Sequence, residues 1–385
     1  MTDHSNRLPA LDSLRGFAAL FVLMYHITMQ STPHSAPAIA FKQVFSLGWT
    51  GVDLFFVLSG FLITSLLVAA KGSTNYFRVF YARRGLRILP LYYATLIVLF
   101  GVPLFVRLPG DFVVPFRDQI WFWTYLQNFH WLGAKFAGFT GPLWSLAIEE
   151  QFYLVWPLLI LLASRRRALL ICAGCVLLSV FYRIYAIQSV PHLDTYYVTQ
   201  ARLDGLSIGS AIALVSSDRT WLLRIRKFTP AIAIGATALI AATGRSIHGA
   251  KLPLFPALYS SVALLYGCLL IVALTTSFEG PSRILKSRIL RFYGRYSYAL
   301  YVIHSPLMTV LWHVGVTPNN LSLGGSDLVG QILYTFAIAA PATGLALLSW
   351  HILEKHFLKL KRHFEYDMGG YAKAPLVATP SMVEQ

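Results

Sequence analysis

Hydrophobic residues occur along the chain in runs of about 20, separated by short polar or basic connections. A run of about 20 apolar residues spans the hydrocarbon core of a bilayer as an α-helix. We therefore expect an all-α polytopic membrane protein of about ten transmembrane helices. The predicted spans cover residues 10–30, 46–70, 88–107, 142–163, 168–188, 201–216, 229–244, 254–277, 297–315 and 328–353.

One aromatic segment is too short to be a further span. Residues 120–131 (IWFWTYLQNFHW) are apolar, and Trp and Tyr rings favour the headgroup level. We predict an interfacial helix here, because a true span would move the cations at 165–167 to the opposite side of the membrane. Residues 1–363 then form one transmembrane domain, and residues 364–385, which show no periodicity, are expected to be a disordered cytoplasmic tail.

Composition and charge agree with this membrane class. Hydrophobic residues make up 56% of the chain and charged residues only 12%, which excludes an ordinary soluble protein. The net charge of +16 comes from basic clusters between the apolar runs, and these fall on one side of the membrane if both termini are cytoplasmic. We expect the inner (plasma) membrane, with lipid as a partner. Nucleic acid is not expected, because there is no folded basic domain to bind it.

The three cysteines lie inside apolar segments. Cys172 and Cys175 form a CxxC pair, but Leu, Ile and Ala flank it and no second pair or nearby histidine completes a metal site. We interpret these cysteines as packing residues. The sequence predicts no metal and no permanently bound cofactor.

Arg15 and His26 are ionisable residues inside the first predicted span, where charge is costly and is usually retained for function. Eleven positions separate them, so both lie on nearly the same helix face, about 16 Å apart along the axis. A structural interpretation is equally open: Arg15 would reach the cytoplasmic interface and His26 would be a satisfied helix contact. The spacing does not decide between the two.

Three further spans carry charge. Arg84 and Arg87 share one helix face at the cytoplasmic mouth of the third span, where they either anchor the helix or clamp phosphate oxygens. Asp53 in the second span either contacts a neighbouring helix or serves the chemistry. Glu149 and Glu150 are adjacent in the fourth span and point about 100° apart. We expect one of them to face the bundle interior, near the histidine of the first span.

Later segments contain Arg202, Asp204, His304 and Glu354. The Arg202–Asp204 pair and His304 are either polar contacts within the bundle or part of the chemistry, and we favour the structural interpretation.

Taken in order, these segments resemble the acyltransferase-3 family of membrane O-acyltransferases. The resemblance rests on the Arg15–His26 spacing, GVDLFFVLSGF, the RxxR of Arg84 and Arg87, WSLAIEE, RLDGLSIG and YSYALYVIH. It extends over about residues 7–354, and the ordered set is specific although each motif alone is weak. The family often has an acid followed by proline near the last helix, whereas here Lys-His-Phe follows Glu354.

The resemblance implies transfer of an acyl group, with acetyl expected, from acyl-CoA to a hydroxyl of a carbohydrate or glycoside acceptor. It implies His26 as the general base, with Arg15 in the same motif. Arg84 and Arg87 would hold CoA phosphates, and Glu149 would be the acid of the WSLxxE motif. Many relatives carry an extra extracytoplasmic hydrolase-like domain that is not in this sequence, so the chain is expected to act alone or with a separate partner.

The mechanism that follows leaves alternatives open. Glu149 or Asp53 would hold the His26 imidazole in its reactive tautomer. Direct transfer and an acyl-histidine intermediate both fit, and the acceptor is not identified. A proton-coupled transporter of a small anionic or sugar-like solute would also use intramembrane His, Arg and Glu. Such transporters typically show inverted repeats and broken helix pairs, which we do not find in this sequence.

Overall fold

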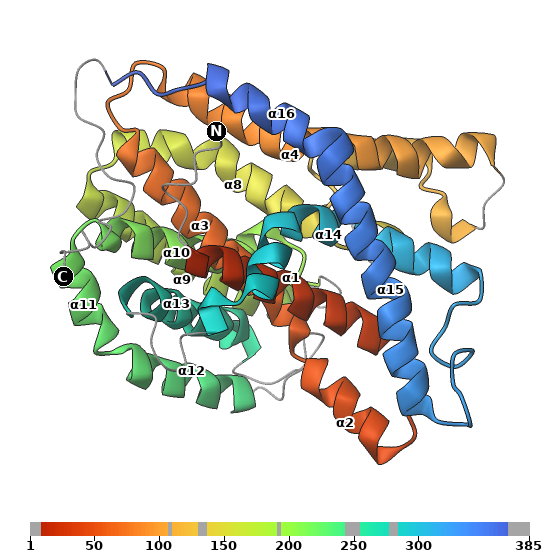
Figure 1. Cartoon of the computed structure of the whole chain (residues 1–385). Coiled ribbons are helices and arrows are strands. Elements are labelled where there is room, and N and C mark those ends of the chain that lie inside the picture. Colours follow the sequence, from red (N-terminus) through yellow and green to blue (C-terminus); the bar gives the residue numbers. More distant parts are fainter. Residues whose placement is uncertain are drawn as a thin grey trace, which may run out of the picture.

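The computed structural model describes residues 9–106, 110–129, 137–190, 194–242, 255–276 and 284–368. Every regular element in these ranges is helical, apart from an isolated β-bridge between Leu323 and Ser326. The helices form one bundle, with α1 near its centre (Figure 1).

Each of the ten predicted spans corresponds to a helix. These are α1 (Pro9–Met29), α3 (Gly51–Ala69), α4 (Tyr76–Phe105), α8 (Leu143–Leu162), α9 (Arg165–Ser189), α10 (Thr199–Ser216), α12 (Thr229–Ala242), α13 (Leu258–Thr275), α14 (Arg288–His313) and α15 (Asp327–Ser349). Shorter helices are α2 (Ala36–Phe45), α5 (Phe116–Trp123), α7 (Ala137–Thr140), α11 (Arg219–Arg226) and α16 (Lys355–Lys359). Within the described ranges, seven helical segments are long and apolar enough to cross a membrane, and α11 with α12, bent by 51°, makes an eighth. α10 and α14 have the length but not the composition.

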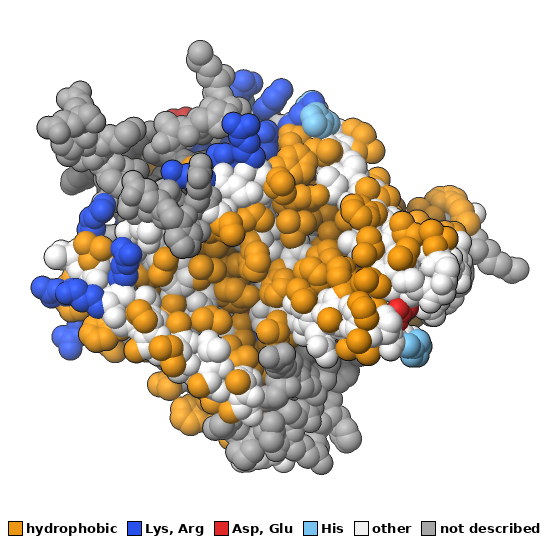
Figure 2. All heavy atoms as spheres, turned by 60° about the horizontal axis from the view of Figure 1, so that its bottom comes forward, with side chains coloured by type: hydrophobic (Ala, Val, Ile, Leu, Met, Phe, Trp, Pro, Cys, Tyr) orange, Lys and Arg blue, Asp and Glu red, His pale blue; other side chains and the backbone are white. Residues whose placement is uncertain are grey.

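The outer surface of the bundle is apolar. Leu104, Phe105, Leu162 and Ile234 are 71–88% exposed, although each has a large hydrophobic side chain. Figure 2 shows a broad expanse of such side chains, with lysine and arginine side chains gathered along its upper and left edges. A surface of this kind is stable in lipid and not in water. The predicted all-α polytopic membrane fold of about ten helices is confirmed.

α1 and α14 pack against each other at backbone distance. A Cβ on Gly16 would lie 1.9 Å from the Leu290 carbonyl oxygen, and a Cβ on Gly294 would lie 1.8 Å from the Asp12 carbonyl oxygen. Only glycine fits at both places, and small residues let membrane helices approach this closely. The contact fixes α1 against α14, and both helices carry site residues.

α3 and α10 form a second close pair. Cβ atoms on Gly60 and Gly209 would each lie 1.9 Å from a carbonyl oxygen of the facing helix, that of Leu206 or Val57. The GVDLFFVLSGF and RLDGLSIG segments are therefore in direct contact. The small residues in these two motifs have a packing function.

Two helices begin earlier than predicted. α4 starts at Tyr76 and not near residue 88, and α14 starts at Arg288 and not near residue 297. The predicted loops before them were basic, but arginine is a good helix former, and nothing in these stretches ends a helix. Arg84 and Arg87 are consequently helical residues with defined directions.

The aromatic segment predicted as a helix over 120–131 is helical only to Trp123, as the end of α5. Tyr125 then takes a positive φ of 56°, which a helix does not continue through. Residues 130 and 131 lie outside the described part of the chain.

The described chain continues past the predicted boundary at 363. Asn75 Nδ2 donates to the Glu365 carbonyl at 2.9 Å, and the Asp367 amide donates to Asn75 Oδ1 at 3.0 Å. The Thr74 amide donates to the Asp367 carbonyl at 3.1 Å. Residues 364–368 therefore pack beside the start of α4, while 369–385 lie outside the described residues.

Candidate active site

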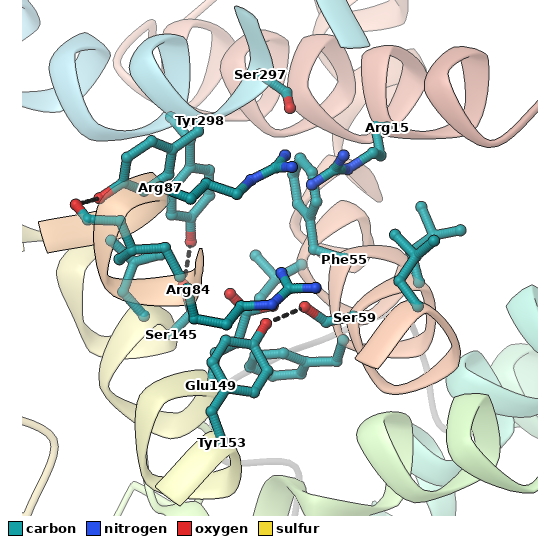
Figure 3. A pocket seen from close by; sticks show the side chains of 17 residues that line it. Arg15, Phe55, Ser59, Arg84, Arg87, Ser145, Glu149, Tyr153, Ser297 and Tyr298 are labelled. Atoms are coloured by element: carbon teal, nitrogen blue, oxygen red, sulfur yellow. Dashed lines mark hydrogen bonds between the residues drawn. The ribbon is translucent and has the colours of Figure 1, made fainter. Parts of the chain in front are cut away.

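A cavity lies between α1, α3, α4, α8 and α14 (Figure 3). Its volume of about 70 Å³ exceeds what one water needs, which is about 10–15 Å³. Its polar lining residues are Arg15, Ser59, Arg84, Arg87, Ser145, Glu149, Tyr153, Ser297, Tyr298 and Tyr301. Four of the predicted site residues, from three helices, thus meet in one place.

The cavity carries an excess of positive charge. The guanidinium groups of Arg15, Arg84 and Arg87 point into the same space (Figure 3). Glu149 is the carboxylate in the lining, and it interacts electrostatically with all three arginines. Three cations and one anion give a formal balance of +3 − 1 = +2. A half-buried site with this balance attracts an anion.

Glu149 is held on the cavity side of α8 by polar contacts from α3 and α8. The Ser59 hydroxyl lies beside its carboxyl group and lines the same cavity. The Ser59 hydroxyl also bonds the Tyr153 hydroxyl, and the Arg84 guanidinium lies 5.7 Å from the centroid of the Tyr153 ring. Ser59 and Tyr153 were not singled out from the sequence. Tyr153 lies four residues after Glu149, one helical turn away on the same face, and this spacing was the available signal.

Glu150 points away from the cavity, as adjacent helical residues must. It interacts electrostatically with the phenol groups of Tyr92, Tyr125 and Tyr298, and its Oε1 atom is buried without a hydrogen-bond partner. The two adjacent acids therefore have different surroundings: Glu149 interacts with three arginines, and Glu150 with several tyrosines and with Arg84 alone among the arginines.

His26 lies beyond the cavity, where α1 meets α14. Its Nδ1 atom is 3.2 Å from Nε2 of His304 and 3.0 Å from the Val22 carbonyl oxygen. Tyr301 separates this pair from the cavity: it lines the cavity, and its ring centroid is 5.9 Å from that of His304. The same face of α1 thus presents Arg15 to the cavity and His26 to α14.

Asp53 does not contact His26, and this differs from the predicted role. Its Oδ1 atom accepts a hydrogen bond from Arg202 Nη2 at 2.9 Å, and both side chains are at most 1% exposed. The Arg202 guanidinium also lies 4.3 Å from the centroid of the Tyr259 ring. A buried carboxylate needs such a cation, because leaving either charge unpaired is very costly. Asp53 therefore joins α3 to α10 through its ion pair with Arg202.

Glu149 does not orient the imidazole either, since it faces the arginines of the cavity. His304 occupies the position in which the sequence analysis expected a carboxylate. The interpretation of His304 as a structural contact accounted for its burial but not for its partner.

A second buried ion pair lies near the first. Arg183 Nη1 bonds Asp204 Oδ2 at 2.9 Å, and Ser260 Oγ donates to the same oxygen at 2.7 Å. Arg202 and Asp204 therefore pair with other helices and not with each other. Arg183 was missed in the sequence, although an arginine inside the fifth apolar run was a visible signal.

The fold and the site together define a polytopic helical membrane protein with a cationic intramembrane cavity and a histidine pair beside it. A family model described as an acyltransferase domain matches residues 8–351. The chain belongs to this family, acyltransferase-3, and the resemblance drawn from the motifs is confirmed.

Curated relatives agree with the family. A putative peptidoglycan O-acetyltransferase of Bacillus subtilis (strain 168) is 31% identical, over 92% of this chain and 55% of the relative. The peptidoglycan O-acetyltransferase of Listeria monocytogenes serovar 1/2a is 29% identical, over 86% of this chain and 54% of its own. The chain thus spans about half the length of the curated relatives it matches. No solved structure matches it.

Proposed function

We propose that this protein is a membrane O-acetyltransferase that passes an acetyl group from acetyl-CoA to a hydroxyl of a cell-envelope glycan. The family supports acyl transfer, and the names of the relatives support acetyl and a glycan. The observation that supports acetyl-CoA as the donor is the excess of two positive charges in the cavity.

Coenzyme A suits this cavity because its diphosphate and 3′-phosphate are anionic and its pantetheine arm is narrow. Arg84 and Arg87 each present a planar fork that matches phosphate oxygens. Lys361 lies in the same electrostatic cluster, close enough to interact with Arg83, Arg84 and Arg87. The positive charge therefore extends from the cavity to Lys361.

The proposed reaction is a direct transfer in which His26 is the base. His26 takes the proton from the acceptor hydroxyl as the oxygen attacks the thioester carbonyl. The new C–O bond forms, the C–S bond breaks, and the CoA thiolate leaves and takes up the proton. The thioester carbonyl and the acceptor hydroxyl therefore have to meet near Tyr301, which lies between the cavity and the histidine pair. We place the protein in the inner (plasma) membrane with both termini cytoplasmic, so that CoA enters at the arginines.

The donor assignment predicts a separation of binding from turnover. Arg84→Ala and Arg87→Ala should each weaken acetyl-CoA binding by about 10- to 100-fold, because a charge-assisted hydrogen bond of about 1.5–3 kcal/mol is lost. His26→Ala should bind acetyl-CoA as the wild type does, yet lose about 10² to 10⁴ in turnover. Calorimetry and transfer assays on detergent-purified variants measure both quantities.

Arg78→Ala is the matched control, because Arg78 is exposed on the same helix and does not line the cavity. Dephospho-CoA gives a second comparison: an arginine that contacts the 3′-phosphate should matter less with that donor. Normal acetyl-CoA binding in both arginine variants, combined with lost binding in His26→Ala, would reverse the assignment. Mass spectrometry of envelope glycans from cells with and without the gene identifies the acceptor.

A further inference from the structure

We propose that His304 is a positioning residue that fixes the tautomer of His26 and accepts a hydrogen bond from it during the reaction. This inference rests on the proposed function, in which His26 is the base. It is carried by three contacts of the two imidazoles with each other and with their own helices.

The protonation of His304 follows from its backbone contact. Its Nδ1 atom lies 3.1 Å from the carbonyl oxygen of Leu300, one turn earlier in α14. A carbonyl oxygen only accepts, so Nδ1 carries the hydrogen. A neutral imidazole has one donor and one acceptor nitrogen, and Nε2 of His304 is therefore an acceptor.

The protonation of His26 follows in turn. Its Nδ1 atom faces two acceptors, Nε2 of His304 at 3.2 Å and the Val22 carbonyl oxygen at 3.0 Å. Nδ1 must carry the hydrogen, and Nε2 of His26 keeps its lone pair. That tautomer is the one a general base needs at Nε2.

The second imidazole distinguishes this pair from the other histidines in the described part of the chain. His351 Nδ1 also faces a carbonyl four residues back, Leu347, at 2.8 Å, but His351 is exposed. His304 is 1% exposed, and its partner is another side chain. Several described histidines therefore contact the carbonyl oxygen four residues earlier in their own helix. The contact of His26 with a second, buried imidazole occurs where α1 meets α14.

His304 also suits the reaction step itself. When Nε2 of His26 takes the hydroxyl proton, the ring becomes a cation, and the hydrogen bond from Nδ1–H to His304 becomes charge-assisted and stronger. The stabilisation is larger in the charged state than before reaction, so it lowers the barrier. The proton then leaves with the CoA thiolate, and His304 stays neutral throughout, with its hydrogen on Nδ1.

The test compares His304→Leu with His304→Gln. Leucine offers no acceptor, whereas the glutamine amide oxygen can occupy the place of Nε2. His304→Leu should lower kcat about 10- to 100-fold, the usual loss for a residue that orients a reactive histidine, with KM for acetyl-CoA unchanged. His304→Gln should recover most of kcat. His351→Leu is the matched control and should behave as the wild type.

Equal loss of kcat in both variants would overturn the proposal, and so would a parallel rise in KM and fall in melting temperature. Nitrogen NMR of ¹⁵N-histidine-labelled protein tests the tautomer without any activity. We expect a proton on His26 Nδ1 with a coupling to His304 Nε2, and a proton on His26 Nε2 would contradict us. If the wild type transfers no acetyl group but shows this coupling, the proposed function fails and the contact stands.

Discussion

Glu149 and Glu150 illustrate how much one helical step changes a residue's surroundings. Glu149 interacts with three arginines, while the Oε1 atom of Glu150 is buried without a hydrogen bond. A carboxylate among cations contributes favourable charge interactions, whereas one among aromatic rings gains little from ionisation. The two acids should therefore respond differently to the same substitution.

Glu149→Gln should lower acetyl transfer about 10- to 100-fold, since charge-assisted contacts of about 1.5–3 kcal/mol are lost. Glu150→Gln should stay within about threefold of the wild type, because Glu150 interacts with one arginine, Arg84, whereas Glu149 interacts with three, and its Oε1 atom has no hydrogen bond to lose. The comparison needs kcat and KM for acetyl-CoA on both purified variants. Equal mild effects would give both acids a purely structural role.

Residue spacing within a helix could be predicted, but partners between helices could not. The Arg15–His26 spacing predicted one shared face. α14 does lie along that face, since its Ser297 lines the cavity with Arg15 and its His304 contacts His26. The Asp53–Arg202 pair joins residues 149 positions apart, and no local pattern encodes such a pairing. The same limit applies to His304 and His26, which are 278 positions apart.

At the scale of elements, the contact between α1 and α14 sets the geometry of the site. It places Arg15 at the cavity beside Ser297 and holds the two histidines together. Because Gly16 and Gly294 allow the backbones to touch, any added side chain there must move one helix.

Gly294→Ala should destabilise the protein by about 1–3 kcal/mol, since its Cβ would overlap the Asp12 carbonyl oxygen. It should also lower kcat, because the His26–His304 distance depends on this contact. Gly344→Ala on α15 is the control, as a Cβ there has no neighbour within 4 Å. Thermal unfolding and transfer assays measure the two effects, and equal behaviour of the two variants would argue against the glycine contact.

The existence of each predicted span followed from hydrophobic run length, but some boundaries did not. Arginines before residue 88 looked like a loop, yet α4 continues through them. Their charge marks the membrane edge, and it says little about whether the backbone is helical. The cavity depends on this difference, because Arg84 and Arg87 point inward only as part of a helix.

For the whole molecule, orientation in the membrane is the main consequence of the charge distribution. Exposed cations occur at Arg165, Arg219, Arg288 and Arg362, each in a connection or helix end assigned to the cytoplasm. The positive-inside rule predicts that these ends face the same side.

Reporter fusions after Arg167 and after Arg362 should report cytoplasm, and fusions near Pro115 and Asn319 should report the outside. One reporter active in the cytoplasm and one active only outside give the readout. An outside signal at Arg167 would mean that the segment around α5 crosses the membrane, and the count of spans would change.

The pairing of α1 with α14 also has a consequence for biosynthesis. Ser13 Oγ donates to the Leu285 carbonyl, just before α14 begins, across 272 positions, so α1 leaves the ribosome long before α14. During that interval His26 is in the translocon or the bilayer without His304, its partner from α14. With His26 as the proposed base, the nascent chain should be inactive until α14 has been inserted. A truncated product that ends before residue 288 lacks the α1–α14 contact and should therefore show no acetyl transfer.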